Sequence, residues 1–180
     1  MRVAGFQATN TAIQNPFTFF YVQNNDWSAT HSYQFWNKNF TTAVGVNNDE
    51  TLKTIYSPSP SGFVEPKTAA FTGFTSTGGN TSNGSQLNTS GSWNAGWYLY
   101  TTGWQTGGTI FFDSQGFRDT YNGRSGTGNI INYGQEGLFW TVGALNSAYG
   151  YAFSAGSGGI CPRDEKLRSY GLECRPVLNN

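Results

Sequence analysis

The chain has 180 residues, a length that suits one domain with a single hydrophobic core. Its 10 basic and 10 acidic residues balance to a formal charge of zero, which argues against a basic surface for nucleic acid. Aromatic residues make up 17% of the chain and can fill a core, so the low charge does not indicate disorder. The 24 glycines, with many Asn, Ser and Thr residues, exclude an all-helical fold.

Residues 1–55 carry short aromatic runs separated by Asn-rich segments. The runs at 16–22 and 33–36 predict short strands joined by turns, and no helix is predicted in this part of the chain. We predict the main helix at about 66–74, where Pro66 stands early and its missing N–H costs little.

Residues 75–91 are mostly Ser, Thr, Asn and Gly, with almost no apolar side chain. Such a segment cannot bury enough surface to join a core, so we predict a mobile surface loop there.

The sequence after Trp93 has the character of strands and tight turns. Tyr149, Tyr151 and Phe153 alternate with small residues, which places three rings on one face of a strand. The strands that we expect in this part are 97–100, 109–112, 138–141, 148–153 and 171–175. The whole pattern predicts an α+β domain that is rich in sheet, with one or two short helices and long loops.

Few groups could support catalysis or hold a metal ion. His31 is the only histidine, and its polar surroundings favour a surface or hydrogen-bonding role over one in a nucleophilic triad. Cys161 and Cys174 have neither metal-ligand spacing nor a dense disulfide framework, and their pairing stays open. No zinc cluster and no calcium-loop motif is visible, so we predict a protein that is not an enzyme and needs no cofactor or metal.

The composition also bears on where the protein acts. No apolar run reaches the roughly 20 residues of a membrane helix. The first residues contain no signal peptide, which leaves open an export signal upstream of this chain. The scarcity of Lys and the wealth of Asn, Thr, Gly and Trp favour an extracellular, cell-surface or virion-surface location.

Four segments follow one another in the order of the motifs of a bacterial surface-protein family. They are 56–66 with its Pro-x-Pro loop, 110–112 together with 116–119, 137–140 and 168–175. On these motifs the chain resembles the Fib-succ-major paralogous domain and the variable proteins of diversity-generating retroelements. The resemblance covers about 53–177. It implies a C-type-lectin-like fold for 53–180, with 1–52 as a strand-rich N-terminal extension packed on the same domain.

The chain departs from the family pattern at two positions. The family commonly has Cys where this chain has Ser59 and Pro176. The absence of both cysteines together is expected if, in the family, the two normally form a disulfide with each other. Sugar-binding C-type lectins hold calcium with Glu-Pro-Asn or Gln-Pro-Asp, whereas Lys67 follows Glu65 and Pro66 here. A cation in place of an oxygen ligand disfavours calcium-dependent sugar binding.

Charge is concentrated near the C-terminus, where seven charged residues fall between Arg163 and Arg175. One interpretation is a solvated turn before the last strand. The resemblance instead matches 163–167 to runs of Asn that retroelements diversify, and it marks further changeable positions before them. The predicted ligand-binding residues are Tyr133, Gln135, Glu136, Leu138, Val142, Leu145, Asn146, Arg163, Asp164, Glu165 and Lys166. Trp140 and Arg168 match fixed family positions, so we assign them to the scaffold.

The resemblance therefore implies a non-catalytic domain for receptor recognition or adhesion, with a variable patch for a protein or other macromolecular ligand on another surface. Neither the ligand nor the oligomeric state is predicted. An alternative is a structural or fimbrial-tip domain without a dedicated ligand. A template repeat downstream of the gene would favour the ligand-binding domain. Flanking pilin genes without such a repeat would favour the structural or fimbrial-tip domain.

A third interpretation comes from the enzyme class. Gly171, Leu172 and Arg175 faintly resemble the closing signature of formylglycine-generating enzymes, which share a related fold. Their chemistry needs a pair of thiols, and Cys161 and Cys174 fall at positions that neither pattern uses. This enzyme is therefore disfavoured.

Overall fold

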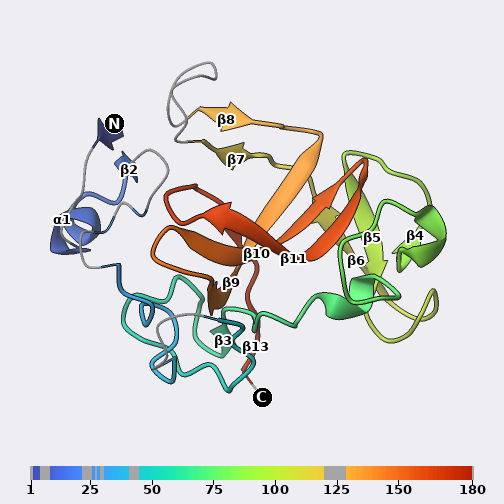
Figure 1. Cartoon of the computed structure of the whole chain (residues 1–180), viewed down its shortest axis with the longest axis horizontal. Helices are drawn as coiled ribbons and strands as arrows, with labels where there is room; N and C mark the ends of the chain where they lie inside the picture. Colours follow the sequence, from blue (N-terminus) through green and yellow to red (C-terminus); the bar gives the residue numbers. More distant parts are fainter. Residues whose placement is uncertain are drawn as a thin grey trace.

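The computed structural model describes residues 2–4, 9–21, 26, 28, 31–40, 45–119 and 129–179. Short strands dominate it, as Figure 1 shows. The elements in order are β1 (Arg2–Ala4), α1 (Thr9–Gln14), β2 (Phe19–Tyr21), β3 (Phe63–Val64), the 3-10 helices η1 (Thr72–Phe74) and η2 (Gly84–Gln86), β4 (Thr89–Ser90), β5 (Gly96–Tyr100), β6 (Thr109–Asp113), β7 (Phe117–Arg118), β8 (Ile130–Ile131), β9 (Glu136–Ala144), β10 (Tyr149–Gly156), β11 (Gly159–Leu167), β12 (Glu173–Cys174) and β13 (Val177–Leu178). The predicted sheet-rich α+β class is confirmed, with one α-helix among the described residues.

The largest sheet has the strand order β11-β10-β9-β12. β9, β10 and β11 are long antiparallel neighbours, and β12 runs parallel to β9. The register of β10 shifts between Gly150 and Ala152 against β9, and between Ala152 and Ser154 against β11. β9 is an interior strand whose residues from Gly137 to Ala144 are all buried, so both of its faces are covered.

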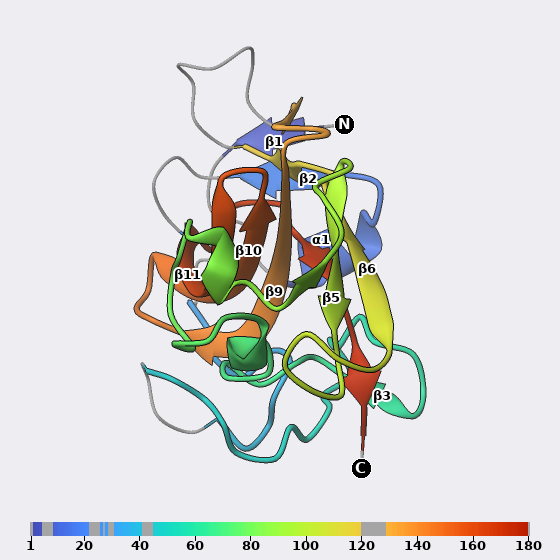
Figure 2. The same cartoon turned by 90° about the vertical axis from the view of Figure 1, so that its right-hand side faces the viewer.

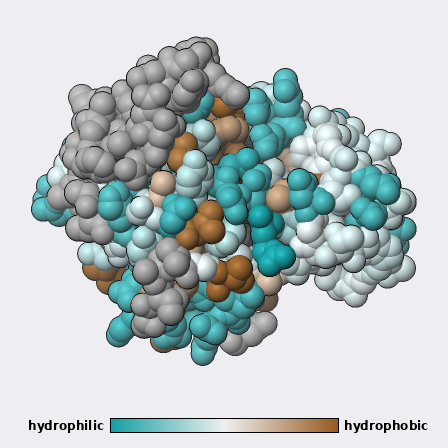
Figure 3. Space-filling model, viewed as in Figure 1, coloured by the Kyte–Doolittle hydropathy of each residue, from teal (hydrophilic) through white to brown (hydrophobic). Residues whose placement is uncertain are grey.

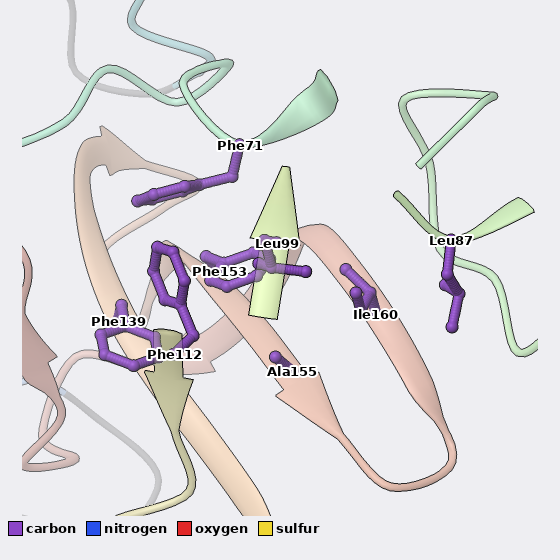
Figure 4. Packing of buried hydrophobic residues seen from close by; sticks show 8 residues of the cluster. All are labelled: Phe71, Leu87, Leu99, Phe112, Phe139, Phe153, Ala155 and Ile160. Carbon is purple, nitrogen blue, oxygen red and sulfur yellow. The ribbon is translucent and has the colours of Figure 1, made fainter. Parts of the chain in front are cut away.

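A second sheet, of order β4-β5-β6, packs beside the first (Figure 2). Its inward side chains meet those of β9, β10 and β11 in one aromatic cluster (Figure 4). The ring centroid of Phe112 on β6 lies 5.1 Å from those of both Phe139 and Phe153. Edge-to-face pairs of this kind contribute about 0.5–1.5 kcal/mol each beyond the area they bury. The buried members are Phe71, Leu87, Leu99, Phe112, Phe139, Phe153, Ala155 and Ile160.

The predicted strands are found where aromatic residues alternate with other types. The expected segments 97–100, 109–112 and 138–141 fall within β5, β6 and β9, and 148–153 falls within β10 except for its first residue. Smaller pieces of the expected 16–22 and 171–175 form β2 and β12. The segment 33–36, expected as a strand, forms bends instead.

The helix predicted at 66–74 is wrong, because the segment forms successive turns that end in η1. The backbone N–H of Thr68 donates to the carbonyl of Asn47 over 2.9 Å, and the Thr68 hydroxyl accepts from the N–H of Asn47. The following N–H groups of Ala70, Thr72 and Phe74 each bond three residues back, which is the tighter 3-10 pattern. The α-helix instead lies at α1, where none was expected.

The prediction that 75–91 stays out of the core is also wrong. The segment contains η2 and β4, and Leu87 is 4% exposed within the aromatic cluster. Asn88 holds the loop in place: its amide nitrogen donates to the carbonyls of Gly73 and Gly103, and its oxygen accepts from the N–H of Gln105. Polar bonds to the backbone thus supply the order that apolar residues do not.

Arg168 joins the N-terminal residues to the large sheet. Its Nη1 lies 3.2 Å from Oδ2 of the buried Asp26, and its guanidinium donates to the carbonyls of His31 and Ser32. The same group lies 5.0 Å from the ring centroid of Tyr33. In the part of the chain that the structure describes, no helix is long and apolar enough to cross a membrane.

Candidate functional site

A polar pocket of about 420 Å³ lies where the beginning of β9 meets the hairpin between β10 and β11. We call it the polar pocket. Its lining residues are Asn80, Asn132, Gln135, Glu136, Ser154, Gly156, Ser157, Gly158, Gly159, Ile160, Cys161 and Asp164. Three of the predicted ligand-binding residues, Gln135, Glu136 and Asp164, are among them. On the face shown in Figure 3, hydrophilic side chains lie beside a few hydrophobic ones near the centre, where Figure 1 places β10 and β11.

Strand pairing brings these distant segments together. Glu136 lies opposite Gly156, which in turn pairs with Gly159 across the hairpin. Thr81 and Ile160 exchange two backbone hydrogen bonds of 3.0 Å, and this bridge carries Asn80 to the pocket. Gly159 has a φ of +148°, and a Cβ there would lie 2.4 Å from the carbonyl oxygen of Thr81. Only glycine permits that approach.

The Glu136 carboxylate is fixed on both oxygens. Oε1 accepts from the Ser154 hydroxyl over 3.0 Å, and Oε2 accepts from Nδ2 of Asn132 over 2.9 Å. Asn132 adopts the left-handed region at a φ of 55°, which Asn tolerates, and its carbonyl accepts from the N–H groups of Gln135 and Glu136. The turn before β9 is thereby preorganised.

Lys166 bridges the two carboxylates beside the pocket. Its Nζ lies 2.8 Å from Oδ2 of Asp164 and 4.0 Å from Oε1 of Glu136. Each of these side chains keeps a fifth to a quarter of its surface exposed, so water screens the ion pairs and they add little stability. Their effect is to set the shape and the charge of this surface.

Cys161 contributes a thiol to the wall of the pocket, and it is not in a disulfide. Burial raises the pKa of this thiol, and the nearby carboxylate of Asp164 raises it further. The thiol is therefore protonated at neutral pH and is a weak nucleophile. Among the described residues, no group of three or more His, Cys, Asp or Glu side chains is placed to hold a metal ion.

Two of the predicted ligand-binding residues are corrected by the structure. Leu138 is 0% exposed and Val142 is 6% exposed, because both lie on the interior strand β9. Neither side chain presents surface to a macromolecule.

The remaining predicted residues do not form one patch. Tyr133 is 78% exposed in the turn beside the polar pocket. Arg163 and Glu165 are exposed on β11, but strand alternation points them to the opposite face from Asp164 and Lys166.

Leu145 and Asn146 lie in the turn after β9, at the far end of that strand from Tyr133. For its nine residues this separation is about 26 Å. The Asn146 carboxamide oxygen accepts from the N–H groups of Ala148 and Tyr149, so it shapes its own turn.

Sequence reasoning missed six of the pocket side chains, namely Asn80, Asn132, Ser154, Ser157, Ile160 and Cys161. Asn132 precedes a strand by a turn and stands four residues from Glu136, a spacing that could have indicated a side-chain hydrogen bond. Asn80 gave no such signal, since only the bridge from Thr81 to Ile160 brings it to the site.

A second cavity, of about 460 Å³, lies between the N-terminal residues and the large sheet. Aromatic rings line much of it, and Trp140, Val142 and Arg168 belong to its wall. Trp140 is 8% exposed there. Arg168 uses its guanidinium on Asp26 and on the backbone carbonyl of His31, so this side chain of the wall is engaged in holding the fold.

Comparison with models of known protein families, with curated proteins and with solved structures finds no match for this chain.

Proposed function

We propose that the chain is a non-catalytic ligand-binding domain with a C-type-lectin-like fold, which recognises a protein or other macromolecule on another surface. The observation that carries this proposal is the polar pocket, whose carboxylates and amides are held by the ends of long, well-packed strands. A rigid frame with polar side chains at its edge is what a recognition surface needs. β3 pairs with β13, so strands near the two ends of the region 53–180 lie side by side. This pairing supports treating 53–180 as the C-type-lectin-like domain.

The recognition surface that we propose is smaller than the predicted patch. It consists of Tyr133, Gln135, Glu136, Asp164 and Lys166. These side chains are exposed or partly exposed, and none belongs to the aromatic cluster. Exposed positions outside the core tolerate substitution with little loss of stability, which supports the interpretation that a retroelement diversifies them. Receptor recognition or adhesion outside the cell, at a bacterial or virion surface, is the function that fits.

Adjacent residues of β11 supply a matched test. The double variant Asp164→Ala/Lys166→Ala removes one charge of each sign from the recognition surface, and Arg163→Ala/Glu165→Ala does the same on the opposite face. We expect both to unfold within a few degrees of the wild type, because water screens the partly exposed Asp164–Lys166 pair and because Arg163 and Glu165 are exposed on β11. Binding is measured on arrays of surface proteins and oligosaccharides. Only the first variant should lose it, by about tenfold or more.

Equal losses from the two variants would place the ligand elsewhere. If the wild-type chain binds no molecule on the arrays, the structural or fimbrial-tip alternative would be favoured.

A further inference from the structure

We infer that the ligand of the polar pocket is a neutral saccharide, bound without a metal ion. This inference rests on the proposed function and adds the chemical class of the ligand.

The first argument is the hydrogen-bonding character of the lining. Asn80 and Gln135 line the pocket, both are exposed, and their side chains make no hydrogen bond to another described residue. A carboxamide donates through its nitrogen and accepts through its oxygen. Hydroxyl groups also do both, so two such amides in one lining match a molecule that carries several hydroxyls.

The second argument is charge. The carboxylates of Glu136 and Asp164 are already engaged by Ser154, Asn132 and Lys166. A phosphate or other anion would meet these two carboxylates, and a cation would have to displace the ammonium of Lys166 from its 2.8 Å contact. A ligand without charge avoids both costs.

The third argument separates a saccharide from a protein. Protein interfaces rely on apolar or aromatic anchors that fill a desolvated hole. Ile160 is the one large apolar side chain among the described residues of this lining, and it is only 1% exposed. The lining thus exposes no large apolar side chain to a ligand. Tyr133, 78% exposed in the adjoining turn, presents a ring against which the C–H face of a sugar can pack.

Metal independence follows from the same residues. Sugar sites that use a cation need several carboxylate or amide oxygens directed at one point. Both oxygens of Glu136 accept from neighbouring side chains, and an oxygen of Asp164 faces the ammonium of Lys166.

The test uses the full chain on an array of neutral oligosaccharides in a buffer that contains EDTA. The strongest binder is then titrated by calorimetry against the wild type, Gln135→Ala, Asn80→Ala and Arg163→Ala/Glu165→Ala. We expect the affinity of each pocket variant to fall about tenfold, as for the loss of one or two hydrogen bonds, and that of the double variant to stay unchanged. The midpoint of thermal unfolding should not change, because the side chains of Asn80 and Gln135 make no hydrogen bond to another described residue and the backbone bonds of Gln135 survive its replacement by Ala.

Three outcomes would overturn the inference. They are an empty oligosaccharide array, binding that EDTA abolishes, and equal weakening by the Arg163/Glu165 control. A different result would separate the two proposals. If no oligosaccharide binds, but a protein ligand binds the wild type and not Asp164→Ala/Lys166→Ala, the saccharide is excluded and the proposed function stands. If neither kind of molecule binds, both proposals fail.

Discussion

Cys174 shows how one residue responds to its surroundings. It lies partly buried on β12, in register with Trp140 of β9. Burial raises the pKa of its thiol to about 12, and the carboxylates of Glu65 and Glu173 add to the effect. Glu65 is fully buried and accepts hydrogen bonds from the hydroxyls of Ser57 and Ser59 and from the Ser59 N–H. A fixed negative charge therefore lies near a thiol that must stay neutral.

This arrangement predicts a loss of stability at alkaline pH. The ordinary pKa of a thiol is 9.0, so above that pH the unfolded chain ionises Cys174 while the folded chain keeps it protonated until about 12. The free energy of unfolding contributed by this thiol is thus complete below pH 9 and falls as the pH rises toward 12. Replacing Cys174 by Ser should flatten this part of the pH profile, measured by urea unfolding from neutral to alkaline pH.

Cys161 provides the control for that experiment. Its thiol pKa is also raised, but by less, so Cys161→Ser should change the alkaline profile less than Cys174→Ser does. Tyrosines and lysines titrate in the same range and affect all variants alike. A Cys174→Ser protein whose profile matches the wild type would show that this thiol ionises freely in the folded state.

At the scale of elements, Arg168 links β11 to the residues that precede the large sheet. Its side chain is only 14% exposed, and Asp26 beside it is 3% exposed. Removing one partner of a buried ion pair leaves an uncompensated charge and costs about 3–5 kcal/mol. We therefore expect Arg168→Ala to lower the midpoint of thermal unfolding and to expose residues 31–40 to limited proteolysis.

Arg168→Lys tests the geometry rather than the charge. A single ammonium cannot replace the planar fork that reaches Asp26 and the carbonyls of His31 and Ser32 together, so it should restore only part of the stability. Arg163→Ala, which removes an exposed arginine five residues earlier, should leave both measurements unchanged. Proteolysis of Arg168→Ala at the wild-type rate would refute the link.

Elements were predictable from the sequence where side-chain alternation alone decides the structure. β5, β6, β9 and β10 were found because their aromatic residues recur at strand spacing. The turns at 66–74 were not, because a bond from Thr68 to Asn47, distant in sequence, replaces the helical pattern. Leu87 was missed since it is a single apolar residue in a polar segment, and such a segment usually stays outside a core.

The candidate site was predictable only in part, for a similar reason. The resemblance marked Leu138 and Val142 as changeable, yet the run from Leu138 to Val142 is mostly apolar, which is typical of a strand covered on both faces. Both residues are buried, so the apolar run was a better guide to them than the resemblance. Strand alternation also separates Asp164 and Lys166 from Arg163 and Glu165, but the sequence does not say which pair faces the pocket.

At the scale of the whole molecule, Phe112 connects the two sheets. Its ring contacts Phe71 and Phe74 at centroid distances of 5.9 and 5.5 Å, and Phe139 and Phe153 at 5.1 Å. Because one cluster holds both sheets, neither can lose its packing without exposing the other. We expect a single cooperative unfolding transition, with the same midpoint by circular dichroism of the backbone and by aromatic fluorescence.

Phe112→Ala should lower the free energy of unfolding by about 3–5 kcal/mol, because the cavity it leaves lies between four rings that cannot all move inward. Tyr98→Ala, on the neighbouring strand but 50% exposed, should cost clearly less. The fraction of Phe112→Ala that remains folded should bind with wild-type affinity, since none of the side chains of the recognition surface belongs to the cluster. Two separate transitions, or a loss of affinity in the folded fraction, would mean that the sheets fold independently or that the core shapes the pocket directly.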